Sequence, residues 1–210
     1  MAWLTKARHW VFQLMRCPLC RCRLSSALGC CASCASELFK PMANVDQVVL
    51  GEYQGALKQA VLALKFNHVT RLSRLFGQAL AHQVRQQGWQ IDLVCAVPLH
   101  ITRRFGRGYN QAALIARVAA RELAVPYRPV LYRRRPTRQQ AKLGAAARRA
   151  NVAAAFGCRA LNGEQVLLMD DVITSGATIT ECSLALFEAG ARRVQVAAVA
   201  LAKAEREVPL

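Results

Sequence analysis

Acidic residues are scarce in this chain of 210 residues, which carries 12 Asp and Glu against 29 Lys and Arg and has a formal net charge of +17. The deficit is concentrated in residues 101–150, which hold 13 basic side chains and one acid, Glu122. A solvated, salt-bridged face would need acidic partners in similar number. The imbalance therefore excludes a neutral face for this quarter of the chain and favours a polyanionic partner.

The chain also has no long apolar run. Near the C-terminus, the uncharged apolar stretch 194–202 is far shorter than the ~20 residues that cross a bilayer. The N-terminal apolar patch 10–15 is interrupted by Gln13 and ends at Arg16 with no small-residue cleavage site, which excludes a secretory signal. We therefore expect a protein of the reducing cytoplasm, where nine cysteines are not expected to form a disulfide framework.

Apolar residues are nevertheless plentiful. A hydrophobic share of 54% excludes a disordered chain, because disordered chains lack the apolar surface that offsets the entropy of ordering. The length suits one medium domain, or one domain with a small appendage. Apolar residues recur at helical spacing in 1–16, with basic residues elsewhere on the turn, and predict an amphipathic helix. We expect its apolar stripe to pack on the protein; the alternative is contact with the inner face of a membrane.

Six of the nine cysteines fall between positions 17 and 34. Four of them form two C-x-x-C pairs separated by ten residues: Cys17, Cys20, Cys31 and Cys34. This spacing is typical of four thiolates around one tetrahedral zinc ion, with Cys22 and Cys30 close enough to be alternative ligands. The segment 17–44 is too short to bury a core of its own, so we predict that structural zinc supplies its folding free energy.

From residue 45 onward, strand-like and helix-like patterns alternate. Strands are predicted at 45–52, 93–97, 127–132, 166–169 and 194–201, and helices at 55–66, 71–87, 110–123 and 177–189. The alternation predicts an α/β domain over residues 45–210, with a mostly parallel sheet flanked by helices. Ligands of such sheets bind beyond the carboxyl ends of the strands.

The segment 166–178 reads VLLMDDVITSGAT. Its first four residues predict a buried strand, and Asp170 and Asp171 are expected to emerge at the carboxyl end of that strand. From Thr174 to Thr178, hydroxyls and backbone N–H groups at a helix N-terminus suit a phosphate, although the Walker pattern is absent. Because carboxylates repel phosphate, we expect the acid pair to face sugar hydroxyls. The predicted ligand is a ribose 5-phosphate.

Two basic segments are expected at the same edge of the sheet. The loop after the strand that ends at Pro98 contains a histidine and three arginines: His100, Arg103, Arg104 and Arg107. Guanidinium groups and backbone amides there suit a pyrophosphate. Residues 133–156 are basic and rich in small side chains, which predicts a mobile lid; the alternative is a solvated loop.

Segment 166–178 resembles the phosphoribosyl diphosphate (PRPP) signature of type I phosphoribosyltransferases. Within that group, the cysteine pairs and the sequence Arg-Gly-Tyr-Asn-Gln at 107–111 resemble the ComF competence-protein family. Leu-Lys-Phe at 64–66 is similar to the family's Leu-Lys-aromatic element, and 137–156 is similar to its basic lid. The resemblance covers nearly the whole chain.

The resemblance implies a type I phosphoribosyltransferase-like fold, preceded by a small zinc ribbon, and Mg²⁺-dependent transfer of phosphoribosyl from PRPP to an acceptor that family membership does not fix. The implied catalytic residues, at the ribose hydroxyls and in the lid, are Asp170, Asp171, Arg135 and Gln140. The implied 5-phosphate residues are Thr174, Ser175, Gly176, Ala177 and Thr178. The implied diphosphate residues are Leu99, His100, Arg103, Arg104, Arg107 and Lys65. Mg²⁺ would be bound mainly through substrate oxygens and water.

Members of the family are linked to natural transformation and the use of external DNA. One hypothesis is therefore a phosphoribosyltransferase, which is a glycosyltransferase acting on PRPP. The alternative is a non-catalytic adaptor that binds single-stranded DNA and contacts the competence DNA-uptake machinery. Few aromatic side chains accompany the basic quarter, so DNA contact would be mostly with phosphates. The basic residues in excess of what one PRPP needs are Arg117, Arg121, Arg128 and Arg133.

Overall fold

A five-stranded sheet forms the centre of the computed structural model, which describes residues 16–17, 20–22, 31–99, 108–134 and 155–202. Its strand order is β1-β2-β7-β6-β3, and every neighbouring pair is parallel except β1 with β2. The strands are β1 (Met42–Ala43), β2 (Gln47–Val49), β3 (Leu93–Ala96), β6 (Gln165–Ile173) and β7 (Arg193–Leu201). The prediction of a mostly parallel sheet is confirmed.

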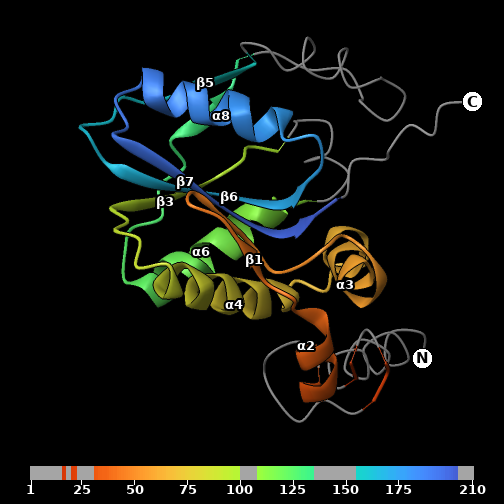
Figure 1. Ribbon diagram of the computed structural model, residues 1–210. Helices are drawn as coiled ribbons and strands as arrows, with labels where there is room; N and C mark the ends of the chain where they lie inside the picture. Colours follow the sequence, from red (N-terminus) through yellow and green to blue (C-terminus); the bar gives the residue numbers. More distant parts are fainter. Residues whose placement is uncertain (1–15, 18–19, 23–30, 100–107, 135–154, 203–210) are drawn as a thin grey trace, which may run out of the picture.

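Helices cover both faces of this sheet. They are α3 (Gly55–Phe66), α4 (Leu72–Gln86), α6 (Gln111–Leu123) and α8 (Ala177–Glu188). Figure 1 shows α4 and α6 against one face, α8 against the other, and α3 at the end where β6 and β7 terminate. The fold is thus a three-layer α/β arrangement in which β6 and β7 end between α3 and the start of α8 (Figure 1).

The central strand β6 is apolar because it is buried on both faces. Leu167 and Met169 pack with the core beside α4 and α6, whereas Val166 and Leu168 pack with the core beside α8. All four side chains are fully buried. A continuous apolar run, rather than an alternating one, is the pattern of such a strand.

The strand β6 extends further than its sequence predicts. It runs to Ile173, so Asp170 and Asp171 lie within the strand and not after it. The reason lies in β7, whose own apolar run continues to Leu201 and offers a parallel partner, with Asp170 opposite Ala198. Since successive strand residues point to opposite faces, the two acids diverge.

A separate antiparallel pair joins β4 (Leu131–Arg133) to β5 (Phe156–Cys158). The strand predicted at 127–132 is wrong in its first half, where Tyr127 makes only an isolated bridge with Val94. Pro129 lies between that bridge and β4 and cannot donate to a ladder. The predicted lid begins and ends in this pair, and residues 135–154 between them lie outside the described residues.

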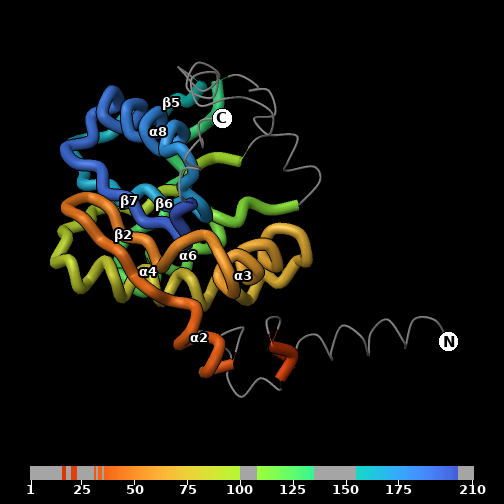
Figure 2. The backbone as a smooth tube through the Cα atoms, turned by 45° about the vertical axis from the view of Figure 1, so that its right-hand side comes forward, coloured from red at the N-terminus to blue at the C-terminus, as the bar shows by residue number. Residues whose placement is uncertain are grey.

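The cysteine segment stands on the face of α3 and α4 away from the sheet (Figure 2). In its short helix α2 (Ala32–Leu38), Leu38 is buried. The rings of Phe39 and Phe76 pack edge to face, with their centres 6.4 Å apart. The helix expected at 1–16 lies outside the described residues, apart from Arg16. In the described part of the chain, no helix has the length and apolar character to span a membrane.

Candidate functional site

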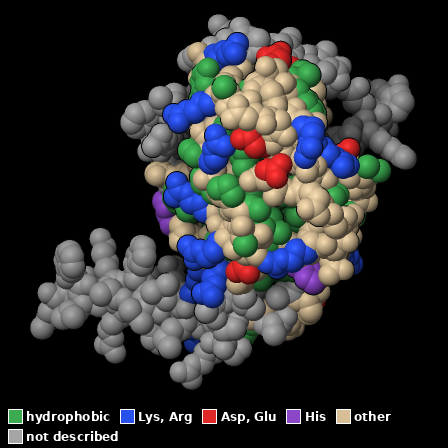
Figure 3. Space-filling view, turned by 90° about the vertical axis from the view of Figure 1, so that its left-hand side faces the viewer, with side chains coloured by type: hydrophobic (Ala, Val, Ile, Leu, Met, Phe, Trp, Pro, Cys, Tyr) green, Lys and Arg blue, Asp and Glu red, His purple; other side chains and the backbone are tan. Residues whose placement is uncertain are grey.

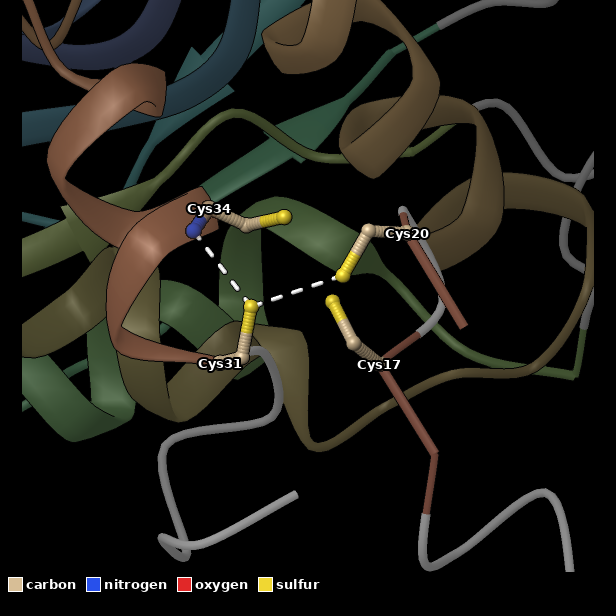
Figure 4. Close-up of side chains that lie close together, drawn as sticks. All are labelled: Cys17, Cys20, Cys31 and Cys34. Atoms are coloured by element: carbon tan, nitrogen blue, oxygen red, sulfur yellow. Dashed lines mark hydrogen bonds between the residues drawn. The ribbon is translucent and has the colours of Figure 1, made fainter. Parts of the chain in front are cut away.

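The first candidate site is a cluster of four thiols. The sulfur atoms of Cys17, Cys20, Cys31 and Cys34 all lie within 4.8 Å of one another. Figure 4 shows the four side chains converging on one point. The two C-x-x-C pairs that the sequence assigns to one metal are therefore brought together.

Local backbone hydrogen bonds hold both pairs in place. In the first pair, the amide of Arg21 donates to the Cys17 carbonyl at 2.8 Å, with Arg21 itself in the left-handed region at φ 60°. In the second pair, Cys31 precedes α2, and its sulfur accepts from the amide of Cys34 at 3.4 Å. Donation to that sulfur lowers the pKa of the Cys31 thiol to about 6, which favours the thiolate that metals bind.

The thiol cluster fits zinc in number and spacing. Four sulfurs at ~2.3 Å from a tetrahedral zinc ion would be about 3.8 Å apart, and the sulfurs of Cys20 and Cys31 lie 3.5 Å apart. Cys17, Cys31 and Cys34 are buried and join the core, which gives the site the closed character of a structural centre. Of the two spare thiols, Cys22 is exposed and Cys30 lies outside the described residues.

The second candidate site is a pocket where β6 leads into α8. It is lined by one acid, three apolar residues, two threonines and a glycine: Asp170, Val172, Ile173, Ile179, Thr174, Thr178 and Gly176. Gly176 caps α8 in the left-handed region at φ 76°, and a Cβ atom there would meet nothing within 4 Å. The first N–H groups of a helix have no intrahelical partner, so those of α8 are available to an anion at this pocket.

Of the predicted 5-phosphate residues, Thr174 and Ser175 are exposed, and the three that follow are half-buried. Thr174 to Gly176 form the turn from β6 into α8, and the last two of the five residues are the first residues of that helix. The pocket also contains residues that the sequence analysis does not single out, namely Val172, Ile173 and Ile179. Their apolar side chains give no distinguishing signal, because any helix–strand junction contains such residues.

The acid pair at this pocket is asymmetric. Asp170 lines the pocket, and its carboxylate accepts from the backbone amide of Asp171 at 2.8 Å. Burial, reinforced by the negative charge of Asp171, raises the pKa of Asp170, against the opposing effects of that hydrogen bond, Lys65 and Arg133. Asp171 instead faces α3, where its Oδ1 lies 2.9 Å from Nζ of Lys65. The family resemblance implies that Lys65 binds the diphosphate, and the contact with Asp171 is not predictable from the sequence.

The predicted diphosphate loop is described only at its borders. Leu99 is half-buried just after Pro98, whereas His100, Arg103, Arg104 and Arg107 lie outside the described residues. After the loop, Asn110 caps α6 by accepting from the amide of Ala113 and donates to the Val97 carbonyl at 3.0 Å. The loop therefore begins and ends next to the carboxyl end of β3. The predicted lid residues Arg135 and Gln140 lie outside the described residues.

Arg133 lies close to the pocket and is engaged by the protein itself. Its Nε donates to the Pro98 carbonyl at 3.2 Å, and its guanidinium lies 4.6 Å from the centre of the Phe156 ring. Its positive charge lowers the pKa of Asp170, against the effect of burial. The sequence predicts Arg133 as a surplus base, whereas the structure places it close enough to Asp170 to affect the pKa of that acid.

The other surplus bases lie away from the pocket, on α6 and the chain that follows it. Arg128 pairs with Glu164 at 3.0 Å, and Arg117 lies over the Tyr127 ring at 5.3 Å, while Arg121 is exposed. Figure 3 views the molecule from the side of the amino strand ends, where Lys and Arg side chains are spread with a few acids between them. This face is separate from the pocket at the carboxyl strand ends.

No protein-family model matches the chain. Its relatives include DNA utilization protein YhgH of Escherichia coli O157:H7, 32% identical over 187 residues that cover 86% of this chain and 81% of that protein. Competence protein F of Haemophilus influenzae is 32% identical over 187 residues, which cover 79% of this chain and 82% of that protein. Similar solved structures include adenine phosphoribosyltransferase from Leishmania tarentolae, with 14% identity, TM-score 0.44, and coverage of 78% of this chain and 95% of that chain. Purine phosphoribosyltransferase from Pyrococcus horikoshii has 15% identity and a TM-score of 0.40, and the match covers 66% of this chain and 78% of that chain.

Proposed function

The chain belongs to the ComF competence-protein family, with DNA utilization protein YhgH and competence protein F, and on this premise we propose that it binds PRPP at the β6–α8 pocket. The observation that supports the proposal most is the junction itself. There Asp170 on the strand and Thr174 to Thr178 at the start of the helix line or border one pocket. Phosphate suits the free amides of the helix, and hydroxyl donors suit the carboxylates.

We further propose that Mg²⁺ accompanies PRPP and that phosphoribosyl transfer to an acceptor follows. Within the described residues, the four thiols are the one cluster of metal-binding side chains, so Mg²⁺ would be held by ligand oxygens and water. The bases predicted in the loop after Leu99 and in the lid would oppose the charge that develops on the departing diphosphate.

Calorimetric titration with PRPP and Mg²⁺ tests the binding proposal, using two matched glycine variants. Gly176 and Gly163 both have positive φ and open space where a Cβ would stand, but Gly163 lies in the loop before β6, at its amino end. Gly176→Ala introduces strain and a methyl group at the pocket and should weaken PRPP binding at least tenfold. Gly163→Ala should leave the affinity within twofold of wild type. Equal affinities in all three proteins would refute the proposed location.

A second candidate function is DNA binding by the face at the amino strand ends, over which Lys and Arg side chains are spread (Figure 3). The name of the YhgH relatives mentions DNA utilization, and the exposed Arg121 lies apart from the pocket. In this alternative the chain binds single-stranded DNA mainly through phosphates and does not consume PRPP. Release of diphosphate from PRPP in the presence of nucleobase or amine acceptors separates the two functions, because only the transferase releases it.

A further inference from the structure

A mostly buried ion pair connects the C-terminal turn of α3 to the acid pair of β6. The side chains of Lys65 and Asp171 are 16% and 14% exposed, and Nζ lies 2.9 Å from Oδ1. Removing one partner of a buried pair leaves the other charge without compensation, which is costly. Lys65 is thus bound to a site residue before any ligand arrives.

We propose that Lys65 is a positioning residue, which neutralises and orients the Asp171 carboxylate for the ribose hydroxyls instead of binding the diphosphate directly. This inference rests on the proposed PRPP site. A carboxylate accepts hydrogen bonds at both oxygens, so an ammonium group on Oδ1 leaves Oδ2 as an acceptor for a hydroxyl. Without Lys65, the Asp171 carboxylate would lose the cation on its Oδ1 and would still be repelled by the negative charge of Asp170.

The backbone that carries Lys65 is itself held by the segment just before α6. The hydroxyl of Tyr109 donates to the carbonyl of Leu64, directly before Lys65. The Tyr109 ring also packs edge to face with the ring of His68, which lies just beyond the end of α3; the ring centres are 5.6 Å apart. Because Tyr109 precedes the capped start of α6, the last turn of α3 is tied to the segment that follows the predicted diphosphate loop. The backbone position of Lys65 is therefore defined, and its side chain extends from that position to Asp171.

The ligands ribose 5-phosphate and Mg²⁺-pyrophosphate separate the two roles of Lys65, since the first has hydroxyls but no diphosphate. We compare Lys65→Met with Lys58→Met, a control on the exposed side of the same helix, where Nζ lies 5.9 Å from the Tyr53 ring centre. By calorimetry, Lys65→Met should weaken ribose 5-phosphate binding at least tenfold, and Lys58→Met less than twofold. Unchanged ribose 5-phosphate affinity in Lys65→Met, with loss of pyrophosphate binding, would make Lys65 a diphosphate ligand and overturn the proposal.

A milder variant and a charge-retaining variant keep the test independent of folding. Tyr109→Phe removes the donor to Leu64 and should weaken ribose 5-phosphate binding two- to fivefold. Lys65→Arg retains the positive charge and should bind more tightly than Lys65→Met. In the double variant Lys65→Met with Asp171→Asn, the loss should not exceed that of Asp171→Asn alone, because Lys65 acts through Asp171. Additive losses would contradict this coupling.

A ligand-free readout distinguishes failure of this inference from failure of the proposed function. The carboxyl ¹³C resonance of Asp171 at pH 7 should move in Lys65→Met and stay in place in Lys58→Met. If wild type binds neither ribose 5-phosphate nor PRPP, the proposed function fails while the resonance still tests the ion pair. If the resonance is the same in wild type and Lys65→Met, the positioning role is wrong whatever the ligand does.

Discussion

At the scale of single residues, the acid pair shows how strongly the position of a residue within a strand determines the surroundings of its side chain. Asp170 and Asp171 are neighbours in sequence, yet one lines the pocket on the α8 side and the other pairs with Lys65 of α3. Strand alternation causes this separation, and it gives the two carboxyl groups different surroundings. The sequence predicts both acids at the site, but their difference depends on β6 extending to Ile173.

Asp170→Asn should stabilise the protein in a pH-dependent way. Burial and the charge of Asp171 raise the pKa of Asp170 from 3.8 to about 7, so ionising it opposes folding. This cost is absent below pH 4, grows as the pH rises toward 7 and is constant above that. The Asn variant keeps the acceptor for the Asp171 amide, and its gain at pH 8 should be on the order of 1–3 kcal/mol.

Urea unfolding of wild type and Asp170→Asn at pH 4.5 and pH 8 measures the effect. The gain in the free energy of unfolding should be larger at pH 8. An equal gain at both pH values would show that Asp170 does not titrate between them in the folded protein.

Gln111 is a second residue whose effect on the free energy of unfolding can be measured. Its side chain is fully buried at the start of α6, and neither its amide oxygen nor its amide nitrogen has a hydrogen-bond partner among the residues that the structure describes. An unpaired buried amide destabilises a fold. Gln111→Leu should therefore raise the free energy of unfolding by about 1 kcal/mol. A loss of 1 kcal/mol or more in thermal or urea unfolding would contradict the unpaired state.

At the scale of elements, helices with strong hydrophobic periodicity are predictable from the sequence, whereas the pairing of strands is not. The pattern at residues 55–66 predicts a helix, and α3 spans Gly55–Phe66. The pattern at 127–132 predicts a strand, but β4 begins only at Leu131 and pairs with β5, which no pattern indicates. Likewise, the C-x-x-C spacing predicts the thiol cluster, whereas the contact of Lys65 with Asp171 joins elements far apart in sequence. Such contacts depend on tertiary packing, which periodicity does not encode.

Zinc removal should loosen the cysteine segment and also weaken the main domain. Leu38 and Phe39 pack against the core beside α3 and α4, so if zinc orders α2, its removal also loses apolar burial. Cys34→Ser should reduce bound zinc well below one equivalent and lower the melting temperature by several degrees. Cys158→Ser, at a half-buried thiol outside the cluster, is the control and should bind one equivalent. Full zinc content in Cys34→Ser would exclude it as a ligand.

At the scale of the whole molecule, most of the net charge of +17 comes from residues 101–150, which hold 13 basic side chains and one acid. Arg133 donates to the Pro98 carbonyl and lowers the pKa of Asp170, and Arg128 and Arg117 have partners in the protein. The exposed Arg121 belongs to the region away from the pocket. Charge alone thus predicts a polyanionic partner, but only the fold shows which bases lie beside the candidate phosphate pocket.

If the face with Arg121 binds single-stranded DNA, affinity should fall steeply with salt. Fluorescence anisotropy with a labelled oligonucleotide between 50 and 200 mM salt should give a negative slope of log affinity against log salt. Arg121→Gln should weaken binding two- to fivefold at low salt and reduce the slope by roughly one. The control Lys58→Gln should change neither. A flat salt response in wild type would exclude phosphate-dominated DNA binding.

The proposed site holds PRPP with its 5-phosphate at the start of α8. The most direct measurement is ³¹P NMR of PRPP with Mg²⁺, in which the 5-phosphate and the diphosphate give separate resonances. Wild type should shift or broaden the 5-phosphate resonance, and Thr178→Val, which removes a hydroxyl that lines the pocket, should reduce that effect. A response of the diphosphate resonances alone, or none in wild type, would contradict the claim.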